Sequence, residues 1–245
     1  MLIVRWSPKC VSAVKNTLMS GATSVCVPSQ TNEHRHGKVR SYYPGRLTLR
    51  PTRTISRQRM TTDQPLILAI GDSLIAGYGL PAADSFPAQL QASLQTRFPD
   101  VRVVNAGVSG DTTADVLRRL PRQLSALDQL PVLAIVQVGP NDVLRQVPAA
   151  RTRVQLEQIL LSLRSCGIPV LLTTVDPPAF IRDRAAAYLG IHAGLAAEHG
   201  VTIWPFFPPG VLRRADMVLV DRVHPNAKAI AAVVAAMRLT VEGML

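Results

Sequence analysis

The sequence predicts an α/β fold in which a five-stranded parallel sheet lies between two layers of helices. Two observations support this prediction. From residue 66 onward, short apolar runs alternate with longer segments of helical periodicity, and strands separated by helices pair in parallel with right-handed crossovers. The apolar runs are nearly continuous, which is typical of parallel strands buried on both faces. The expected architecture is therefore a three-layer α/β/α sandwich.

The strands are expected at the apolar runs. The first run, Leu-Ile-Leu-Ala-Ile, ends abruptly at a Gly-Asp-Ser turn, where glycine permits a sharp change of direction. The second reads Val-Arg-Val-Val-Asn, and the third ends in Ala-Ile-Val-Gln-Val. The expected strand ranges are residues 66–70, 101–105, 132–138, 169–175 and 201–206.

The helices between the strands are bounded by capping residues and glycines. Ser85 is placed to cap the first helix, and Pro87 falls in its first turn, where proline is tolerated. Gly167 and Gly200 end the third and fourth helices. Pro121 lies inside the second helix, so we expect a kink or a break there. The expected helical ranges are residues 86–97, 111–127, 154–165, 182–199 and 226–240.

Basic residues are concentrated near the N-terminus. The chain of 245 residues has a formal net charge of +11, but 11 of its 27 Lys and Arg residues lie in residues 1–59 beside a single acid. This leaves 16 basic and 15 acidic residues in residues 60–245, so the main domain is nearly neutral. We therefore expect no nucleic-acid partner, because the charge lies outside that domain.

The basic segment, residues 1–59, is rich in Arg, Ser and Thr, a composition typical of disorder. Three interpretations are open: a start site assigned too early, with the natural start at Met60; an organelle transit peptide; or a native basic tail. The first is favoured. A start at Met60 predicts a cytoplasmic protein, while the others leave periplasmic, secreted or organellar locations open. Residues 60–245 are expected to form the functional domain.

Several other classes of feature are absent from the sequence. No run approaches 18 consecutive apolar residues, so no membrane span is predicted. Metal-ligand spacing and a glycine-rich phosphate loop are also missing, so neither metal nor cofactor is expected. Three cysteines do not make a disulfide framework, and Cys166 is expected to be a small residue at a helix end.

Four polar segments follow predicted strands or precede the last helix. The first three should converge, because the carboxyl ends of parallel strands share one edge of the sheet, where ligands bind. The segments are Gly-Asp-Ser-Leu (71–74), Gly-Val-Ser-Gly-Asp-Thr (107–112), Gly-Pro-Asn-Asp (139–142) and Asp-Arg-Val-His-Pro-Asn (221–226).

These segments contain the groups needed for nucleophilic catalysis. The Ser73 hydroxyl is a weak nucleophile that needs an adjacent base, which His224 can supply. Asp221, three residues before the histidine, can orient the imidazole. An oxyanion intermediate needs preorganised donors. The backbone N–H groups of Ser73 and Gly110 and the side-chain amide of Asn141 are suitable.

In this order and near this spacing, the four segments resemble the signature blocks of the SGNH (GDSL) hydrolase family. The runs Val-Asn-Ala (104–106), Ala-Gly-Tyr-Gly (76–79) and His-Pro-Asn (224–226) are similar to its bacterial arylesterase, lysophospholipase and acyl-CoA thioesterase subgroup. The resemblance covers residues 66–242 and implies a flavodoxin-like fold.

The resemblance also implies site roles. Ser73 matches the nucleophile of the family, and Asp221 with His224 matches its base pair. Gly110 and Asn141 match its oxyanion-hole residues.

Two sequence details bear on the geometry of this site. Pro140 departs from the pattern, because proline removes a backbone donor and can shift the asparagine that follows. Ile75 stands where the second glycine of the lipase motif G-x-S-x-G would be, so the turn around the serine should differ from that of ordinary lipases.

The activity implied is hydrolysis of carboxylic ester or thioester bonds through a serine acyl-enzyme, with a small-molecule acyl ester or thioester as substrate and no cofactor. Two alternatives stay open: a carbohydrate O-acetyl esterase of the same family, and a non-catalytic ligand-binding module of the same fold. Oligomeric state is not predicted. Apolar residues after the fourth strand and before the histidine are interpreted as lining an acyl pocket: Phe180, Ile181, Met217, Val218 and Leu219.

Other polar residues are expected to have structural roles. Asp72 should steady the turn by hydrogen bonds, and Ser109 should support the glycine loop. Asp142 is expected behind the site or at the surface. His192 and His199 are interpreted as surface or helix-end positions.

Two pairs of arginines, Arg118-Arg119 and Arg213-Arg214, are interpreted as solvated faces. They would attract an anionic head group or a CoA phosphate only if they flank the cleft. Neither pair is assigned a catalytic role.

Overall fold

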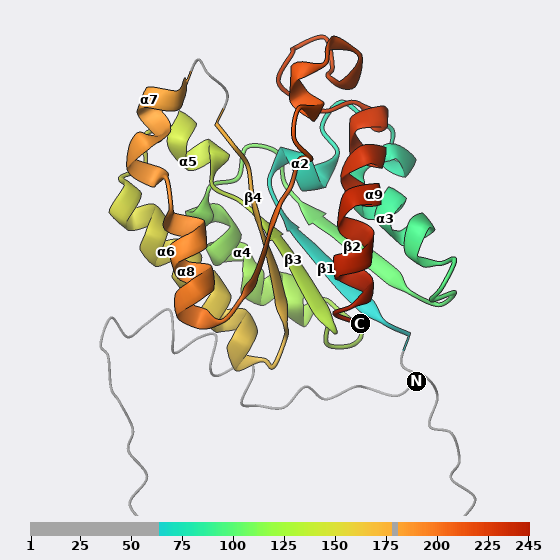
Figure 1. Cartoon of the computed structure of the whole chain (residues 1–245). Helices are drawn as coiled ribbons and strands as arrows, with labels where there is room; N and C mark the ends of the chain where they lie inside the picture. The colour runs from blue at the N-terminus through green and yellow to red at the C-terminus, as the bar shows by residue number, and fades with distance from the viewer. Residues whose placement is uncertain (1–63, 178–180) are drawn as a thin grey trace, which may run out of the picture. The chain divides into compact units, whose positions relative to one another are not determined.

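A five-stranded parallel sheet, as predicted, is the centre of the structure (Figure 1). The structure is a computed structural model that describes residues 64–177 and 181–245. The strand order is β2-β1-β3-β4-β5, and every neighbouring pair is parallel. The strands are β1 (Leu66–Gly71), β2 (Arg102–Gly107), β3 (Leu133–Gln137), β4 (Val170–Thr174) and β5 (Thr202–Pro205). The predicted basic segment, residues 1–59, lies outside the described residues.

Helices cover both faces of this sheet. The longer ones are α3 (Phe86–Leu94), α4 (Thr113–Ser125), α6 (Ala149–Ser165), α8 (Ile191–His199) and α9 (Ala227–Glu242). The short α-helices are α2 (Ser73–Ala76), α5 (Pro140–Leu144) and α7 (Arg182–Ala185). Single 3₁₀ turns are η1 (Ala82–Asp84), η3 (Ala186–Tyr188), η4 (Val211–Arg213) and η5 (Ala215–Met217).

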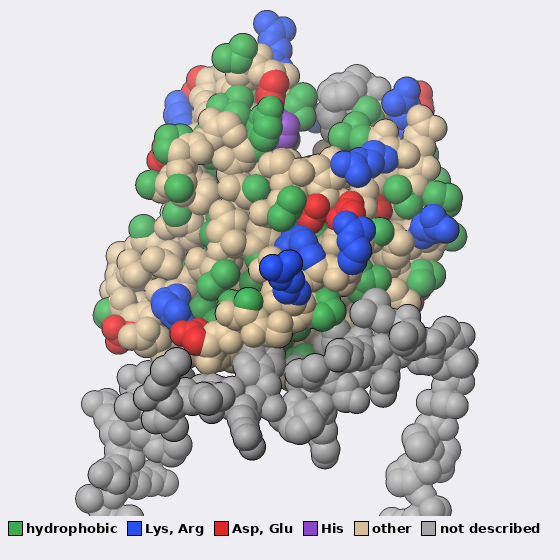
Figure 2. Space-filling view, turned by 180° about the vertical axis from the view of Figure 1, so that it is seen from behind, with side chains coloured by type: hydrophobic (Ala, Val, Ile, Leu, Met, Phe, Trp, Pro, Cys, Tyr) green, Lys and Arg blue, Asp and Glu red, His purple; other side chains and the backbone are tan. Residues whose placement is uncertain are grey.

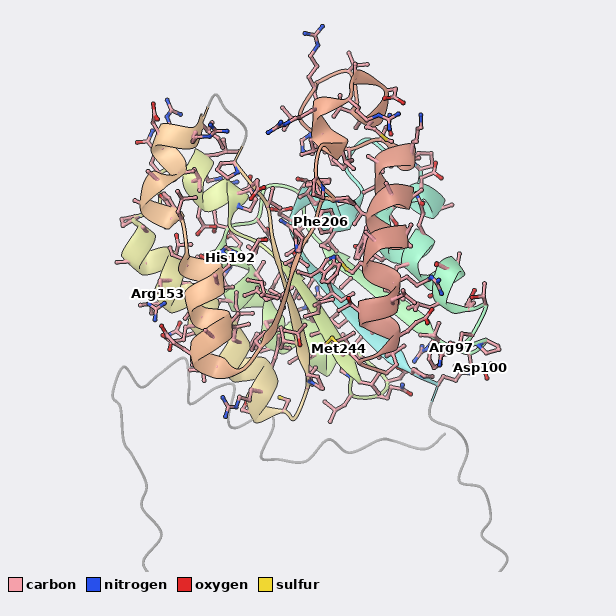
Figure 3. The ribbon with its side chains drawn as sticks, viewed as in Figure 1. Arg97, Asp100, Arg153, His192, Phe206 and Met244 are labelled. Atoms are coloured by element: carbon pink, nitrogen blue, oxygen red, sulfur yellow. The ribbon has the colours of Figure 1, made fainter. Side chains whose placement is uncertain are left out.

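The alternation of side chains along β1 divides the interior into two cores. Leu68 and Ile70 pack with α4, α6 and α8, whereas Ile67 and Ala69 pack with α3 and α9 on the opposite face. All four side chains are fully buried. Burial of one Leu or Ile side chain contributes roughly 1.5–3 kcal/mol, so a continuous apolar run is stable here only between two helical layers. Figure 3 shows Phe206 in the second of these cores, between the sheet and α9.

Two predicted helix ranges are wrong, and of the kink or break expected at Pro121 the break does not occur. α4 continues through Pro121, because its apolar face remains buried against the sheet although one N–H is missing. The single helix expected over residues 182–199 is divided into α7, η3 and α8, since Gly190 at φ +81° cannot continue a right-handed helix. α6 begins at Ala149 rather than at residue 154, directly after Pro148.

Cys166 forms the C-cap of α6, at the helix end where it was expected. In Figure 2, acidic side chains lie directly beside basic ones on the face seen from behind, as the near-neutral composition of residues 60–245 implies. Among the described residues, every helix is too short or too polar to cross a membrane.

Two glycines allow the nucleophile turn to lie against the strand ends. A Cβ atom on Gly71 would lie 1.9 Å from the backbone oxygen of Gln137, and one on Gly107 would lie 2.1 Å from the backbone nitrogen of Ala76. The chain following β1 therefore lies directly against β2 and β3. This contact brings three of the four polar segments to one edge of the sheet.

We expect Gly107→Ala to lower the free energy of unfolding by about 3 kcal/mol, because the added methyl group meets backbone atoms that cannot move independently. The control is Gly194→Ala in α8, where a Cβ would meet only side-chain atoms at 3.8 Å and 3.9 Å. This variant should be as stable as the wild type or up to about 1 kcal/mol more stable. Urea unfolding measures both. Equal stabilities for the two variants would contradict the close approach.

Candidate active site

Ser73 lies at the sharp turn between β1 and α2. Asp72 caps the helix, and its carboxylate accepts a hydrogen bond of 3.0 Å from the Leu74 N–H. α2 ends after one turn at Gly77, whose φ of +81° allows the N–H groups of Gly77 and Tyr78 to donate to the carbonyl of Ser73 at 3.0 Å and 3.1 Å. The serine side chain is thus held at the edge of the sheet by a closed single turn.

The structure brings His224 to Ser73 although 151 residues separate them. His224 Nε2 lies 3.2 Å from Ser73 Oγ, and His224 Nδ1 lies 2.6 Å from Asp221 Oδ2. Because the carboxylate can only accept, Nδ1 carries the proton and Nε2 is left to accept from the serine hydroxyl. This is the arrangement of a serine activated by a histidine base.

Asp221 is held ready to orient the imidazole. Its Oδ1 accepts hydrogen bonds from the N–H groups of His224 at 3.0 Å and Val223 at 2.9 Å. These two bonds, more than the imidazole itself, lower the pKa of Asp221 to about 2. Asp221 is therefore ionised throughout the range in which histidine titrates.

The loop that carries His224 is closed at its base. The N–H of Leu219 donates to the carbonyl of His224 at 2.8 Å, and the N–H of Asn226 donates to the carbonyl of Met217 at 2.9 Å. Asn226 then caps α9. The ring of Tyr78, which follows the nucleophile turn, packs against the imidazole with centroids 4.4 Å apart. The two loops therefore support each other at the site.

The predicted oxyanion donors lie at the same edge of the sheet. The amide of Asn141 donates to the carbonyl of Asp111 at 3.0 Å and makes a longer contact of 3.4 Å to Asp72, so the first, second and third polar segments meet. The backbone N–H groups of Ser73 and Gly110 donate to no acceptor within residues 64–177 and 181–245. Both are available to a ligand.

Pro140 occupies the first turn of α5, directly after Gly139 at φ +126°. Proline fits the first position of a helix, where its missing N–H would have no partner in the helix. Pro140, although it departs from the family pattern, therefore does not prevent the side-chain amide of Asn141 from reaching Asp111 in the second segment.

Two buried carboxylates lie beneath the site. Asp142 is fully buried and accepts bonds from the N–H of Thr113 at 2.9 Å and from the hydroxyls of Thr113 and Thr152 at 2.6 Å and 3.2 Å. Its expected placement behind the site is correct. Asp72 is 1 % exposed, and burial raises its pKa to about 6 despite the bond from Leu74 and the contact with Gln137.

None of the remaining polar candidates among the described residues is hydrogen-bonded to Ser73 or His224. Ser109 is exposed. The surface position expected for His192 is wrong: it is half-buried near the start of α8, 2.9 Å from the carbonyl of Val138 (Figure 3 labels His192). His199 lies at the end of the same helix, as expected, 3.0 Å from Glu157. Glu157, Glu198 and His199 form one cluster of possible metal ligands that sequence spacing does not predict, because α6 and α8 supply it jointly.

That cluster already has partners among the described residues, since Glu198 pairs with Arg153 at 2.6 Å. Arg153 lies on the outer side of α6 in Figure 3. We therefore interpret the cluster as an ion-pair network between α6 and α8 and not as part of the site.

The five residues expected at an acyl pocket fall in different places. Phe180 lies outside the described residues. Ile181 is 9 % exposed and packs with Val143 and Ala185. Met217 is 6 % exposed and packs in a small cluster beside α9. Val218 and Leu219 are half-buried, and Leu219 lies against Gly79 beside the serine turn.

The prediction for Arg119 is wrong. Arg118 is exposed, as expected, and pairs with Asp115 at 2.7 Å. The Arg119 side chain is only 17 % exposed and pairs with Asp111 at 2.6 Å. Spacing along α4 shows that Arg119 follows an exposed residue. It cannot show that the guanidinium of Arg119 reaches back to the end of β1.

A parallel sheet with serine, histidine and aspartate hydrogen-bonded at its carboxyl edge defines a hydrolase of the serine class. The chain belongs to the GDSL-like lipase/acylhydrolase family, whose model matches residues 69–232. The resemblance predicted from the sequence is confirmed.

Named relatives agree with this membership. The arylesterase of Vibrio mimicus is 32% identical over 164 residues, which are 66% of this chain and 81% of the relative. Thioesterase 1/protease 1/lysophospholipase L1 of Escherichia coli is 35% identical over 164 residues, which are 66% of this chain and 76% of that protein. The crystal structure of AlinE4, an SGNH-hydrolase family esterase, is 39% identical, with a TM-score of 0.61 over 76% of this chain and 98% of that chain.

The raised pKa of Asp72 gives a pH-dependent stability. The pKa of Asp72 is about 6 in the folded state and 3.8 ordinarily, so the folded state binds a proton more tightly than the unfolded state. The contribution of protonated Asp72 to the free energy of unfolding is therefore complete below pH 3.8 and is lost as the pH rises through 6. We expect the free energy of unfolding of the wild type, relative to Asp72→Asn, to fall by roughly 2–3 kcal/mol between pH 4 and pH 7. Urea unfolding at both pH values measures this. A difference that does not change with pH would contradict it.

Proposed function

We propose that the protein hydrolyses carboxylic ester or thioester bonds through an acyl-enzyme formed on Ser73. One observation carries this proposal: His224 Nε2 lies 3.2 Å from Ser73 Oγ while its Nδ1 is bound to Asp221 at 2.6 Å. In that tautomer the imidazole can take the proton of the hydroxyl as the oxygen attacks an acyl carbon.

In the acylation step, Ser73 Oγ attacks the acyl carbon and its proton moves to His224 Nε2. Asp221, ionised above about pH 2, stabilises the imidazolium. The oxyanion is bound by the N–H groups of Ser73 and Gly110 and by the Asn141 amide. One amide hydrogen of Asn141 is held by Asp111, whereas the 3.4 Å contact to Asp72 is long, so the second hydrogen can turn to the oxyanion.

Collapse of the tetrahedral intermediate expels an alkoxide or a thiolate, which receives the proton from His224. Water then attacks the acyl group, with His224 again taking a proton, and Ser73 is released together with the carboxylic acid. Each donor in the oxyanion site is worth about 3–4 kcal/mol of transition-state stabilisation. Every proton in the cycle is carried by a group of this chain or by water.

The surroundings of the site favour an acyl or aryl substrate over an acetylated carbohydrate. Tyr78 beside the imidazole is 51% exposed, and Val220 and Val223 on the histidine loop are exposed as well. Exposed apolar and aromatic side chains on the loops of the site suit an apolar group, whereas a sugar requires several polar partners. The names of the relatives, arylesterase and thioesterase 1/protease 1/lysophospholipase L1, support the same substrate class.

We expect Ser73→Ala to lower hydrolysis of p-nitrophenyl butyrate by roughly 10⁴-fold or more, because the acyl-enzyme cannot form. Labelling by a fluorophosphonate probe should disappear with it. Ser109→Ala, which changes an exposed serine of the second segment, is the control and should keep both signals. Equal labelling of Ser73→Ala and wild type would contradict the mechanism. Loss of labelling in Ser109→Ala with labelling retained in Ser73→Ala would contradict it as well.

Leu219, a member of the expected acyl pocket, lies against Gly79 beside the serine turn, and its N–H donates to the carbonyl of His224 at 2.8 Å. We expect Leu219→Glu to lower kcat/KM for p-nitrophenyl octanoate by roughly 10-fold or more, and that for the acetate ester by less than about 3-fold. The ratio of the two rates does not depend on the amount of folded enzyme. Leu239→Glu, on the exposed side of α9, should leave the ratio unchanged. If Leu219→Glu leaves the ratio of the two kcat/KM values unchanged, Leu219 does not contact the acyl chain.

A further inference from the structure

We propose that Arg119 is a positioning residue that holds the Gly110 segment in place for oxyanion binding. The inference rests on the proposed function, since it assigns a residue to the same site. Arg119 lies on α4, behind the edge of the sheet at which Ser73 is presented. It has no hydrogen bond to the serine or the histidine, and it acts through the side-chain carboxylate of Asp111 and the backbone carbonyl of Gly71.

The guanidinium joins two segments that flank the oxyanion site. Its Nε donates to Asp111 Oδ2 at 2.6 Å, and its Nη2 donates to the backbone carbonyl of Gly71 at 2.9 Å. Asp111 directly follows Gly110, and Gly71 precedes Ser73 by two residues. One planar group thus sets the separation between the turn of the nucleophile and the loop of the second oxyanion donor.

The same two anchors are connected to the rest of the site. The carbonyl of Gly71 also accepts from the N–H of Val108 at 3.0 Å, and the N–H of Asp111 donates to the carbonyl of Val108 at 3.1 Å. The carbonyl of Asp111 accepts from the Asn141 amide at 3.0 Å. Two of the three proposed oxyanion donors, Gly110 and Asn141, are therefore positioned through contacts that converge on Asp111.

Packing alone does not account for this arginine. Val116 and Leu120 on the same helix already fill the core, and a largely buried ion pair is seldom more stabilising than an apolar side chain of similar size. Among the described residues, Arg119 Nη1 is buried and has no hydrogen-bond partner. Such an arrangement costs free energy, which is typical of a group retained for its geometry.

The geometry also requires arginine in particular. Two acceptors from separate segments lie in the fork of one guanidinium, which a lysine ammonium cannot span as a rigid plane. Gly110 has a φ of +86°, and its carbonyl accepts from Arg145 Nη2 at 2.7 Å, so Arg119 restrains this segment from the Asp111 side and Arg145 from the other. Donors that are oriented before the reaction stabilise an oxyanion without reorganisation, and a displacement of about 1 Å can cost about 100-fold in rate.

The test compares Arg119→Met and Arg119→Lys with Arg118→Met, which removes the exposed neighbour on the same helix. The readouts are kcat and KM for p-nitrophenyl butyrate and the Ki of phenylboronic acid, whose boron accepts the serine oxygen to give a tetrahedral anion. Active sites are counted by end-point fluorophosphonate labelling, so unfolded protein does not enter kcat.

We expect Arg119→Met to lower kcat by roughly 10- to 100-fold, with KM within about 3-fold of wild type and the Ki rising by the same factor as kcat falls. Arg119→Lys, which keeps the charge and reaches one acceptor, should lie between, and Arg118→Met should match the wild type. If Arg119→Met does not fold, Arg119→Lys alone decides: the proposal predicts a lower kcat and a higher Ki at constant KM.

Wild-type kcat and Ki in a folded Arg119 variant would overturn the proposal, as would a change confined to KM. A wild-type enzyme that is not labelled, or a Ser73→Ala variant that retains full activity, would instead reject the proposed function. The two failures are therefore distinguishable.

Discussion

The 3.2 Å contact between His224 Nε2 and Ser73 Oγ joins two loops that are 151 residues apart, and the function depends on it. It forms because β1 lies in the middle of a parallel sheet, which presents the serine turn at the edge where the histidine loop arrives. Asp221, held by two backbone N–H groups, fixes the imidazole from the other side. A shift of either loop by about 1 Å would break the hydrogen bond between the base and the nucleophile.

Charges buried beneath the site keep these loops in register. Asp142 ties the loop after β3 to the start of α4, and Asp72 accepts from the serine turn. Arg119 and Asp111 connect α4 with the end of β1. Buried charges are costly unless they are hydrogen-bonded, so each is placed where it satisfies backbone groups of an irregular loop. These hydrogen bonds offset the free-energy cost of burying the charged groups.

The sequence predicts the fold and the candidate site well because both depend on local signals. Apolar runs interrupted by glycine give the strands, and the segments around Ser73 and His224 carry residue types whose chemistry is specific. It fails where packing overrides a local rule. Pro121 does not break α4, because the apolar face of that helix stays buried. The helix expected over residues 182–199 is a different case, since the local signal of Gly190, whose φ is positive, divides it.

By itself, the sequence determined the order of strands and helices along the chain and the near-neutral charge of residues 60–245, and it singled out Ser73, His224 and Asp221, which the structure brings together. Tertiary structure alone decided which loop residues touch. It buried Met217 in a small cluster beside α9, placed Leu219 beside the serine turn, and made Arg119, which the sequence presents as a surface residue, a link between two strand ends. The reason is physical: periodicity along a chain shows which face a residue occupies, but contacts between distant segments arise only when the helices pack on the sheet.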